Sequence, residues 1–217
     1  MTLSIDLFWS FRSPYSYLAT PRLVAMQRDY DLDVSVRPVY PLAVRSGEFF
    51  SQVNPMWVAY FMRDVYRLGE MLEVPFRWPR PDPVVVDPAT RAATPNQPYI
   101  HRLTRLGCAA AEAGRGLDFL DETSRIIWSG EIAGWNEGDH LARAAERAGL
   151  DLDALDAKIT ADPEKYEAII LQNQKAHAAA GPWGVPTMAF EGEPFFGQDR
   201  LDVLLWRLKQ RGLKERS

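Results

Sequence analysis

The sequence predicts an α/β fold whose sheet is interrupted by a long helical insertion. Strand-forming runs occur near both ends of the chain, over residues 3–40 and 187–196. The stretch between them is dominated by helical spacing and by helix-forming composition. Removing this middle block leaves the order strand–helix–strand and strand–strand–helix, the two halves of a thioredoxin-like fold. We therefore expect a discontinuous thioredoxin-like domain of residues 1–42 and 181–217, and an inserted helical domain of residues 43–180.

The first half of the fold begins with a strand over residues 3–9, where apolar residues alternate along one face. Ser13 and Pro14 then form the N-cap and first-turn pairing of a helix that runs to about Tyr30. Residues 32–40 alternate again and form a second strand. A strand, a helix and a strand in so short a stretch make a βαβ unit, which implies parallel strands joined by a right-handed crossover.

The middle of the chain is predicted to be helical. Residues 55–72 place apolar and aromatic residues at helical spacing, and the prolines between residues 75 and 88 are too dense for a helix. Successive helices then fill residues 95–180. Breaks are expected near residues 114–116, 130–138 and 149, and the last helix is opened by Asp162-Pro163 and closed by Gly181-Pro182.

Strand signals return in the last part of the chain. Residues 187–190 and 193–196 flank Glu191 and Gly192, a pair typical of a tight hairpin turn. The final helix covers residues 199–211, where leucines recur at i, i+3, i+4 and i+7. These elements complete the second half of the fold.

Composition excludes several classes of function. The 217 residues carry 25 basic and 29 acidic side chains, a net charge of −4, which gives no pull toward nucleic acid or anionic lipid. No apolar stretch is long enough to span a membrane and no secretory leader opens the chain, so we expect a cytoplasmic protein. Cys108 is the only cysteine, which rules out a disulfide framework and a Cys-x-x-Cys pair. The three histidines share no ligand spacing, so no metal site is predicted.

The candidate active site lies where the first strand meets the first helix. In a thioredoxin-like fold, the unpaired N–H groups at this helix start favour an anion, most often a thiolate. Here the Cys-x-x-Cys frame is replaced by Ser13-Pro14-Tyr15-Ser16. A serine cannot exchange disulfides, so a dithiol oxidoreductase is excluded. The Ser13 hydroxyl can instead donate a hydrogen bond to the sulfur of a bound thiol; the alternative is that Ser13 acts only as a helix N-cap.

Three segments give the sequence a resemblance to a known family. They are residues 13–18 (Ser-Pro-Tyr-Ser-Tyr-Leu), 183–187 (Trp-Gly-Val-Pro-Thr) and 196–201 (Phe-Gly-Gln-Asp-Arg-Leu), and residues 60–76 fit in addition. In this order they resemble 2-hydroxychromene-2-carboxylate isomerase and its relative, the kappa-class glutathione transferase. Both belong to the DsbA-like branch of the thioredoxin superfamily. The resemblance spans the whole chain.

The resemblance implies a glutathione site. Ser13 would hold the glutathione sulfur, and Val185, before a cis Pro186, would pair its backbone N–H and C=O with the cysteinyl unit. Gln198 and Asp199 would bind the γ-glutamyl end of glutathione, with the Asp199 carboxylate pairing with the γ-glutamyl ammonium. A helix cap is the other role open to Asp199. In the isomerase, the thiol adds transiently to a conjugated carbonyl substrate, permits rotation about the former double bond, and leaves again. The resemblance therefore implies a glutathione-dependent isomerase of a small aromatic or conjugated keto acid, and a homodimer.

One departure from the family concerns the substrate side. Where the isomerases carry lysines, this chain has Trp57 and Val58. Arg12 is therefore expected to bind a carboxylate of the substrate or of glutathione, because its planar fork suits a carboxylate. The alternative is an arginine that points to solvent or bridges a surface acid. Trp57 and Tyr60 are predicted to line the substrate, with burial in the core as their alternative.

Two other functions stay open on the sequence alone. A kappa-class-like transferase would use the same thiol site. A non-catalytic binding protein would keep the fold and lose turnover. The missing lysines favour the binding protein, whereas the retention of Ser13, Val185-Pro186 and Asp199 argues against it.

Overall fold

The protein is described by a computed structural model that covers residues 2–46, 53–87, 89–90 and 92–216. Its centre is a four-stranded sheet in the order β2-β1-β3-β4. β1 and β2 run parallel, with Leu3 opposite Leu32, and β3 is antiparallel to both β1 and β4. The strands are β1 (Leu3–Trp9), β2 (Leu32–Pro38), β3 (Thr187–Phe190) and β4 (Glu193–Phe196). The thioredoxin-like fold predicted from the sequence is confirmed.

Helices form most of the remaining regular structure. They are α1 (Pro14–Asp29), α2 (Leu42–Arg45), α4 (Pro55–Met71), α5 (Ile100–Glu112), α6 (Gly116–Trp128), α7 (His140–Arg147), α8 (Leu152–Ala161), α9 (Pro163–Ala179), the 3₁₀ turn η1 (Gln198–Arg200) and α10 (Leu201–Gln210). The long helices begin and end close to the predicted boundaries. The short α2 was not predicted, because four residues carry no periodic signal.

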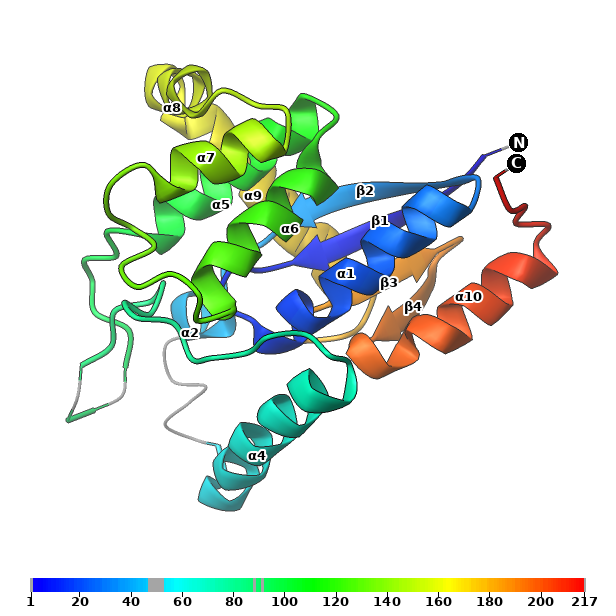
Figure 1. Cartoon of the computed structure of the whole chain (residues 1–217), viewed down its shortest axis with the longest axis horizontal. Helices are drawn as coiled ribbons and strands as arrows, with labels where there is room; N and C mark the ends of the chain where they lie inside the picture. The colour runs from blue at the N-terminus through cyan, green and yellow to red at the C-terminus, as the bar shows by residue number, and fades with distance from the viewer. Residues whose placement is uncertain (1, 47–52, 88, 91, 217) are drawn as a thin grey trace.

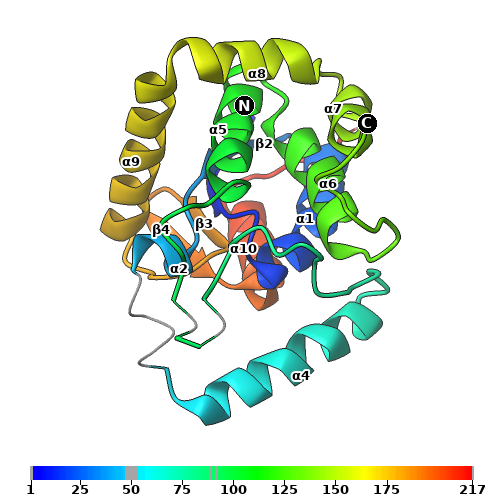
Figure 2. The same ribbon diagram turned by 90° about the vertical axis from the view of Figure 1, so that its left-hand side faces the viewer.

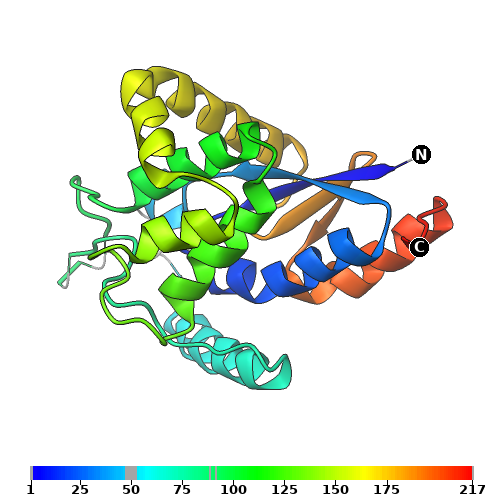
Figure 3. The same cartoon turned by 45° about the horizontal axis from the view of Figure 1, so that its top comes forward.

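The sheet is covered by helices on both faces. α1 and α10 lie against one face, and α9 lies against the other (Figures 1 and 3). β1 is therefore buried on both sides: Leu7 and Phe8 point to opposite faces, and both are buried. Phe8 packs on His177 of α9, with ring centroids 5.1 Å apart. Part of the predicted insertion thus packs directly on the sheet, and the domain boundary at residue 180 stays a prediction.

Two tryptophans hold the chain between β1 and α1. The Nε1 of Trp9 donates to Thr20 Oγ1 at 3.0 Å, which ties the end of β1 to the middle of α1. The Nε1 of Trp128, on α6, donates to the Phe11 carbonyl at 3.0 Å. Both indole rings are fully buried. The residues just before Ser13 are therefore held from two directions.

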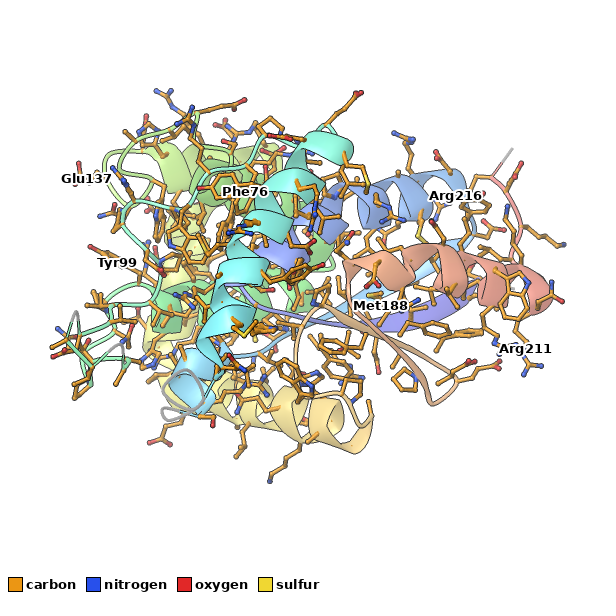
Figure 4. The ribbon with its side chains drawn as sticks, turned by 90° about the horizontal axis from the view of Figure 1, so that it is seen from below. Phe76, Tyr99, Glu137, Met188, Arg211 and Arg216 are labelled. Carbon is orange, nitrogen blue, oxygen red and sulfur yellow. The ribbon has the colours of Figure 1, made fainter. Side chains whose placement is uncertain are left out.

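α4 stands apart from the other helices. It lies along one edge of the molecule, away from the block that contains α5–α9 (Figure 2), and Figure 4 looks onto it from below, with Phe76 beside it. Tyr66 of α4 meets Phe76 edge-on, with ring centroids 5.0 Å apart. The Tyr15 hydroxyl, on α1, donates to Asp64 of α4 at 2.9 Å. These contacts join α4 to the rest of the protein beside the start of α1.

The single cysteine does not line the cavity beside the β1–α1 junction. Cys108 is buried within α5. Burial, with the nearby charges of Glu112 and Glu167, raises the pKa of its thiol to about 12. Such a thiol is inert at neutral pH. In the ranges that the structure describes, no helix is long and apolar enough to cross a membrane.

Candidate active site

A cavity of about 560 Å³ opens beside the carboxyl end of β1. The start of α1, the segment before β3, η1 and α4 surround it. Its size falls in the range of about 300–1,000 Å³ that is usual for small-ligand sites. The residues predicted for the site that line it are Arg12, Ser13, Trp57, Tyr60, Val185, Gln198 and Asp199, and Pro186 follows directly after Val185 in the chain.

Ser13 is at once the N-cap of α1 and a residue of the cavity wall. Its Oγ accepts a hydrogen bond from the Ser16 N–H at 3.2 Å, which is the capping contact. Its hydroxyl proton goes to the carbonyl of Val185, at 3.1 Å. The capping role and the position in the site therefore coexist. Within the fold, the two predicted segments 172 positions apart in sequence meet at one hydrogen bond.

The peptide bond between Val185 and Pro186 is cis, as predicted. It precedes β3, which begins at Thr187 beside β1. Only about 5–6% of X–Pro bonds in folded proteins are cis. The cis bond and its contact with Ser13 confirm the thioredoxin-like arrangement of this corner.

The carbonyl groups of residues 183–186 are each held by a donor. Arg45 Nη2 donates to the carbonyl of residue 183 at 3.3 Å, and Ser13 holds that of residue 185. His177 and Thr187 both lie 2.8 Å from the carbonyl of residue 184. The N–H of Gly197 donates to the carbonyl of residue 186 at 2.9 Å. The backbone of this segment is thereby fixed before any ligand arrives.

Gln198 and Asp199 lie in η1 and also line the cavity. The carbonyl of Gln198 accepts from Arg22 of α1 at 3.0 Å, which anchors η1 to the helix that carries Ser13. The Asp199 carboxylate is largely exposed and pairs with the equally exposed Arg200 at 3.2 Å. Exposed pairs of this kind contribute little, so a ligand cation can replace Arg200.

α4 supplies an aromatic wall. The Trp57 ring stacks on Phe61, with centroids 5.1 Å apart and planes 12° from parallel. Phe61 in turn meets Tyr15 and Trp78 edge-on, at 5.5 and 6.4 Å. Tyr60 is 59% exposed and Trp57 38% exposed. Both predicted residues therefore face the cavity or solvent rather than the core.

Asp64 joins this wall to α1. Its carboxylate accepts hydrogen bonds from Tyr15, at 2.9 Å, and from Tyr60, at 3.3 Å. Arg67 donates to it at 2.7 Å. Burial alone would raise the pKa of Asp64, but these hydrogen bonds and the Arg67 charge outweigh it, so the pKa is lowered. Burial, followed by the hydrogen bond to Asp64, raises the pKa of Tyr15, so the phenol stays protonated at physiological pH.

Arg12 pairs with an acidic residue of the chain itself, and its binding of a ligand carboxylate stays a prediction. Arg12 lines the cavity, and its Nε and Nη2 donate hydrogen bonds to the Asp82 carboxylate, both at 3.1 Å. Asp82 is held in turn by Trp78 Nε1 at 3.2 Å and by the Val84 N–H at 2.9 Å. The carboxylate that Arg12 binds in this structure therefore belongs to the chain itself. Asp82 lies 70 positions away in the proline-rich connector, and no sequence pattern indicates that contact.

Several residues of the site were not predicted from the sequence as functional. Tyr15 and Asp64 stand inside the segments that carry the resemblance, where their pairing was not apparent. Asp82 and His177 carry no motif at all. Among the described residues, no group of three or more His, Cys, Asp or Glu side chains could hold a metal ion.

Known proteins resemble the chain over almost its whole length. Residues 4–209 match the family of DSBA-like thioredoxin domains. The chain is 30% identical over 216 residues to the 2-hydroxychromene-2-carboxylate isomerase of Sphingobium xenophagum, covering 94% of this chain and 97% of that protein. It is 26% identical over 210 residues to the isomerase of the same name from Pseudomonas sp. (strain C18), covering 92% and 87%. A solved structure of 2-hydroxychromene-2-carboxylate isomerase has a TM-score of 0.67 at 22% identity, covering 96% of this chain and 95% of the other.

Proposed function

This chain belongs to the DSBA-like thioredoxin family, and from that premise we propose that it is a glutathione-dependent isomerase of a small conjugated aromatic keto acid. Its curated relatives are isomerase enzymes, which supports an enzyme here as well. One observation carries the proposal: the hydrogen bond from the Ser13 hydroxyl to the Val185 carbonyl. It joins a position suited to a thiol to a backbone segment suited to a peptide, at one cavity.

Ser13 would stabilise the thiol in its charged form. Glutathione, when bound, supplies a thiol that adds to a conjugated double bond, permits rotation about it, and leaves again. For this, the Ser13 hydroxyl would turn its proton from the Val185 carbonyl to the sulfur, while its oxygen keeps the hydrogen bond from Ser16. A hydrogen bond is stronger when the acceptor is charged, and the start of α1 favours an anion.

The residues around Ser13 fit a short peptide with a free amino end. The Val185 carbonyl oxygen has a second lone pair that can accept a hydrogen bond. The backbone N–H of Val185 makes no hydrogen bond to any residue that the structure describes. Both groups can therefore pair with a cysteinyl unit, as an added strand would. Asp199, with its weak exposed partner, would bind the ammonium of the γ-glutamyl end, beside Gln198.

The α4 wall would take the substrate. Trp57 and Phe61 present stacked rings, against which a planar aromatic compound can pack. Tyr60 lies beside them on the same helix. The proposal does not depend on Arg12 for the substrate carboxylate, because the Nε and Nη2 of Arg12 already donate to Asp82.

Two measurements test the proposal. Calorimetric titration should show glutathione binding to the wild-type chain, and its absence would contradict the thiol site. The chain is then mixed with glutathione and 2-hydroxychromene-2-carboxylate, the compound in the relatives' name, and the products are analysed by chromatography and mass spectrometry.

The products separate the remaining candidates. An isomer of unchanged mass supports the proposed isomerase. A stable adduct that carries glutathione would identify a kappa-class-like transferase. Binding of glutathione without any turnover would identify a non-catalytic binding protein. A homodimer in the cytoplasm stays a prediction from the resemblance and from composition.

A further inference from the structure

A buried histidine lies against the segment that precedes β3. His177, on α9, is 1% exposed, and its Nε2 is 2.8 Å from the Gly184 carbonyl oxygen. Because a carbonyl oxygen only accepts, Nε2 carries the proton and donates it. Burial lowers the pKa of His177, and the positive charge of Arg45 lowers it further. The ring is therefore neutral at physiological pH, with its one proton committed to this carbonyl.

The Gly184 carbonyl receives a second hydrogen bond. Thr187, buried at the start of β3, donates its hydroxyl to it at 2.8 Å. The position is also closely packed, because a Cβ added to Gly184 would lie 2.9 Å from the ring of Phe196. Two donors and this packing hold the Gly184 peptide in a single orientation.

That orientation determines where the next N–H points. The bond between Gly184 and Val185 is trans, unlike the one that follows it. In a trans peptide the C=O and the N–H point in opposite directions. The carbonyl points to His177 on α9, so the Val185 N–H points away from α9. Val185 itself lines the cavity, beside Ser13.

We propose that His177 is a positioning residue for the thiol cofactor: by holding the Gly184 carbonyl, it aims the Val185 N–H at the cysteinyl carbonyl of glutathione. This inference rests on the proposed function. His177 touches neither sulfur nor substrate and acts only through the peptide between residues 184 and 185. It also accounts for a polar ring on the face of α9 that packs against Phe8 of the sheet.

The test uses two variants of His177 and a matched control. His177→Phe keeps a ring against Phe8 and loses the donor, whereas His177→Gln keeps an N–H near the position of Nε2. The control is Asn173→Leu. Asn173 is also buried on α9, one turn earlier, and its Nδ2 donates to the Pro38 carbonyl at 3.0 Å. Each loss removes one hydrogen bond to a buried backbone carbonyl, so both His177→Phe and Asn173→Leu should lower thermal stability.

Of these variants, only His177→Phe should bind glutathione clearly more weakly than wild type. Titration should show glutathione binding weakened about tenfold in His177→Phe, the scale of one hydrogen bond. In His177→Gln it should be largely restored, and in Asn173→Leu unchanged. Turnover supported by 2-mercaptoethanol, which has no peptide to pair with Val185, should fall far less in His177→Phe than turnover supported by glutathione. The NMR shifts of the Gly184 carbonyl carbon and the Val185 amide should move in His177→Phe and stay unchanged in Asn173→Leu.

The outcomes separate this inference from the function on which it rests. Wild-type affinity for glutathione in His177→Phe, or an equal loss in Asn173→Leu, would overturn the role of His177 and leave the proposed function standing. If the wild-type chain itself did not bind glutathione, the proposed function would fall and the role of His177 with it. Unmoved shifts of the Gly184 and Val185 backbone in His177→Phe would overturn the positioning whether or not glutathione binds.

Discussion

The segment before β3 and the helix α4 form two walls of one cavity, and they differ in how they are held. The carbonyls of residues 183–186 are bound by donors from α2, from the N-cap of α1, from α9, from β3 and from the residue before η1. Two of these donors, His177 and Thr187, are buried. α4 stands apart, with Tyr60 more than half exposed and Asp64 as its polar link to α1.

The difference indicates that the two walls have different roles in binding. A backbone fixed in advance loses little entropy when it pairs with a ligand, which suits a cofactor that is always the same. Aromatic side chains on an outlying helix lie away from the sheet, which suits a surface that contacts the substrate. We therefore expect substitutions at the first wall to affect thiol chemistry, and substitutions at α4 to affect substrate binding.

The largest effect is expected for Ser13→Ala, at the first wall. The hydroxyl would stabilise charge on sulfur, so turnover should fall about a hundredfold, the scale of losing one donor to a developing anion. Glutathione affinity should change far less, because the neutral thiol needs the hydroxyl less. Steady-state rates and calorimetric titration measure the two quantities.

A second helix cap provides the control for Ser13. Removing the N-cap should cost about 1 kcal/mol of stability in addition to any catalytic effect. Asp151→Ala removes the N-cap of α8, where Asp151 accepts from the Ala154 N–H, outside the cavity lining. It should show a similar stability loss with full turnover. If Ser13→Ala behaved in the same way, Ser13 would be a helix cap only.

At the second wall, Trp57→Ala should weaken the binding of the aromatic substrate. The stacked pair with Phe61 is broken, and the KM for substrate should rise about tenfold, the scale of one aromatic contact. Glutathione affinity should not change. Met56→Ala is the control, because Met56 is 79% exposed on the same helix and does not line the cavity. A loss of glutathione affinity in Trp57→Ala would break the division between the walls.

Asp82→Asn tests what the pairing of Arg12 does for specificity. The charge that neutralises Arg12 is removed, while the new amide still offers an oxygen to the Val84 N–H. An aromatic carboxylate should then bind severalfold more tightly, by an amount smaller than a full hydrogen bond to a charged group. Its carboxamide analogue should bind as before. Equal gains for acid and amide would show that Arg12 does not distinguish charge.

The sequence predicted the part of the site that lies in local patterns. Ser13 before Pro14 is a helix start after a strand, and Val185-Pro186 belongs to a segment with a family resemblance, so both were expected at the cavity. Their meeting follows from the fold, because the parallel and antiparallel neighbours of β1 bring the two segments together.

The contacts that sequence could not predict join segments without periodic signals. Asp82 lies in a connector of prolines, whose path is determined only by packing. His177 looks like a polar residue on a helix, and only the burial of β1 on both faces makes it a buried donor. The partners of Arg12 and of the Gly184 carbonyl are therefore products of tertiary structure.

The smallest effect is expected in the pH dependence of stability that comes from Asp64, which links α4 to α1 through Tyr15. The pKa of Asp64 is lower in the folded chain than in a free carboxyl, because hydrogen bonds to its charged form outweigh burial. Its contribution to stability is therefore complete above about pH 3.9, the value of a free aspartate, and is lost as pH falls through the folded-state pKa.

Asp64→Asn stays neutral at every pH. Its Tm should lie about 2–4 °C below wild type at pH 7, the shift that corresponds to about 1 kcal/mol for a chain of this size, and the gap should close below pH 4. Asp139→Asn, which removes an exposed partner of Arg143, should leave Tm unchanged throughout. A gap for Asp64→Asn that stayed constant between pH 3 and 7 would mean that the charge of Asp64 does not hold α4. The second wall would then depend on its aromatic packing alone.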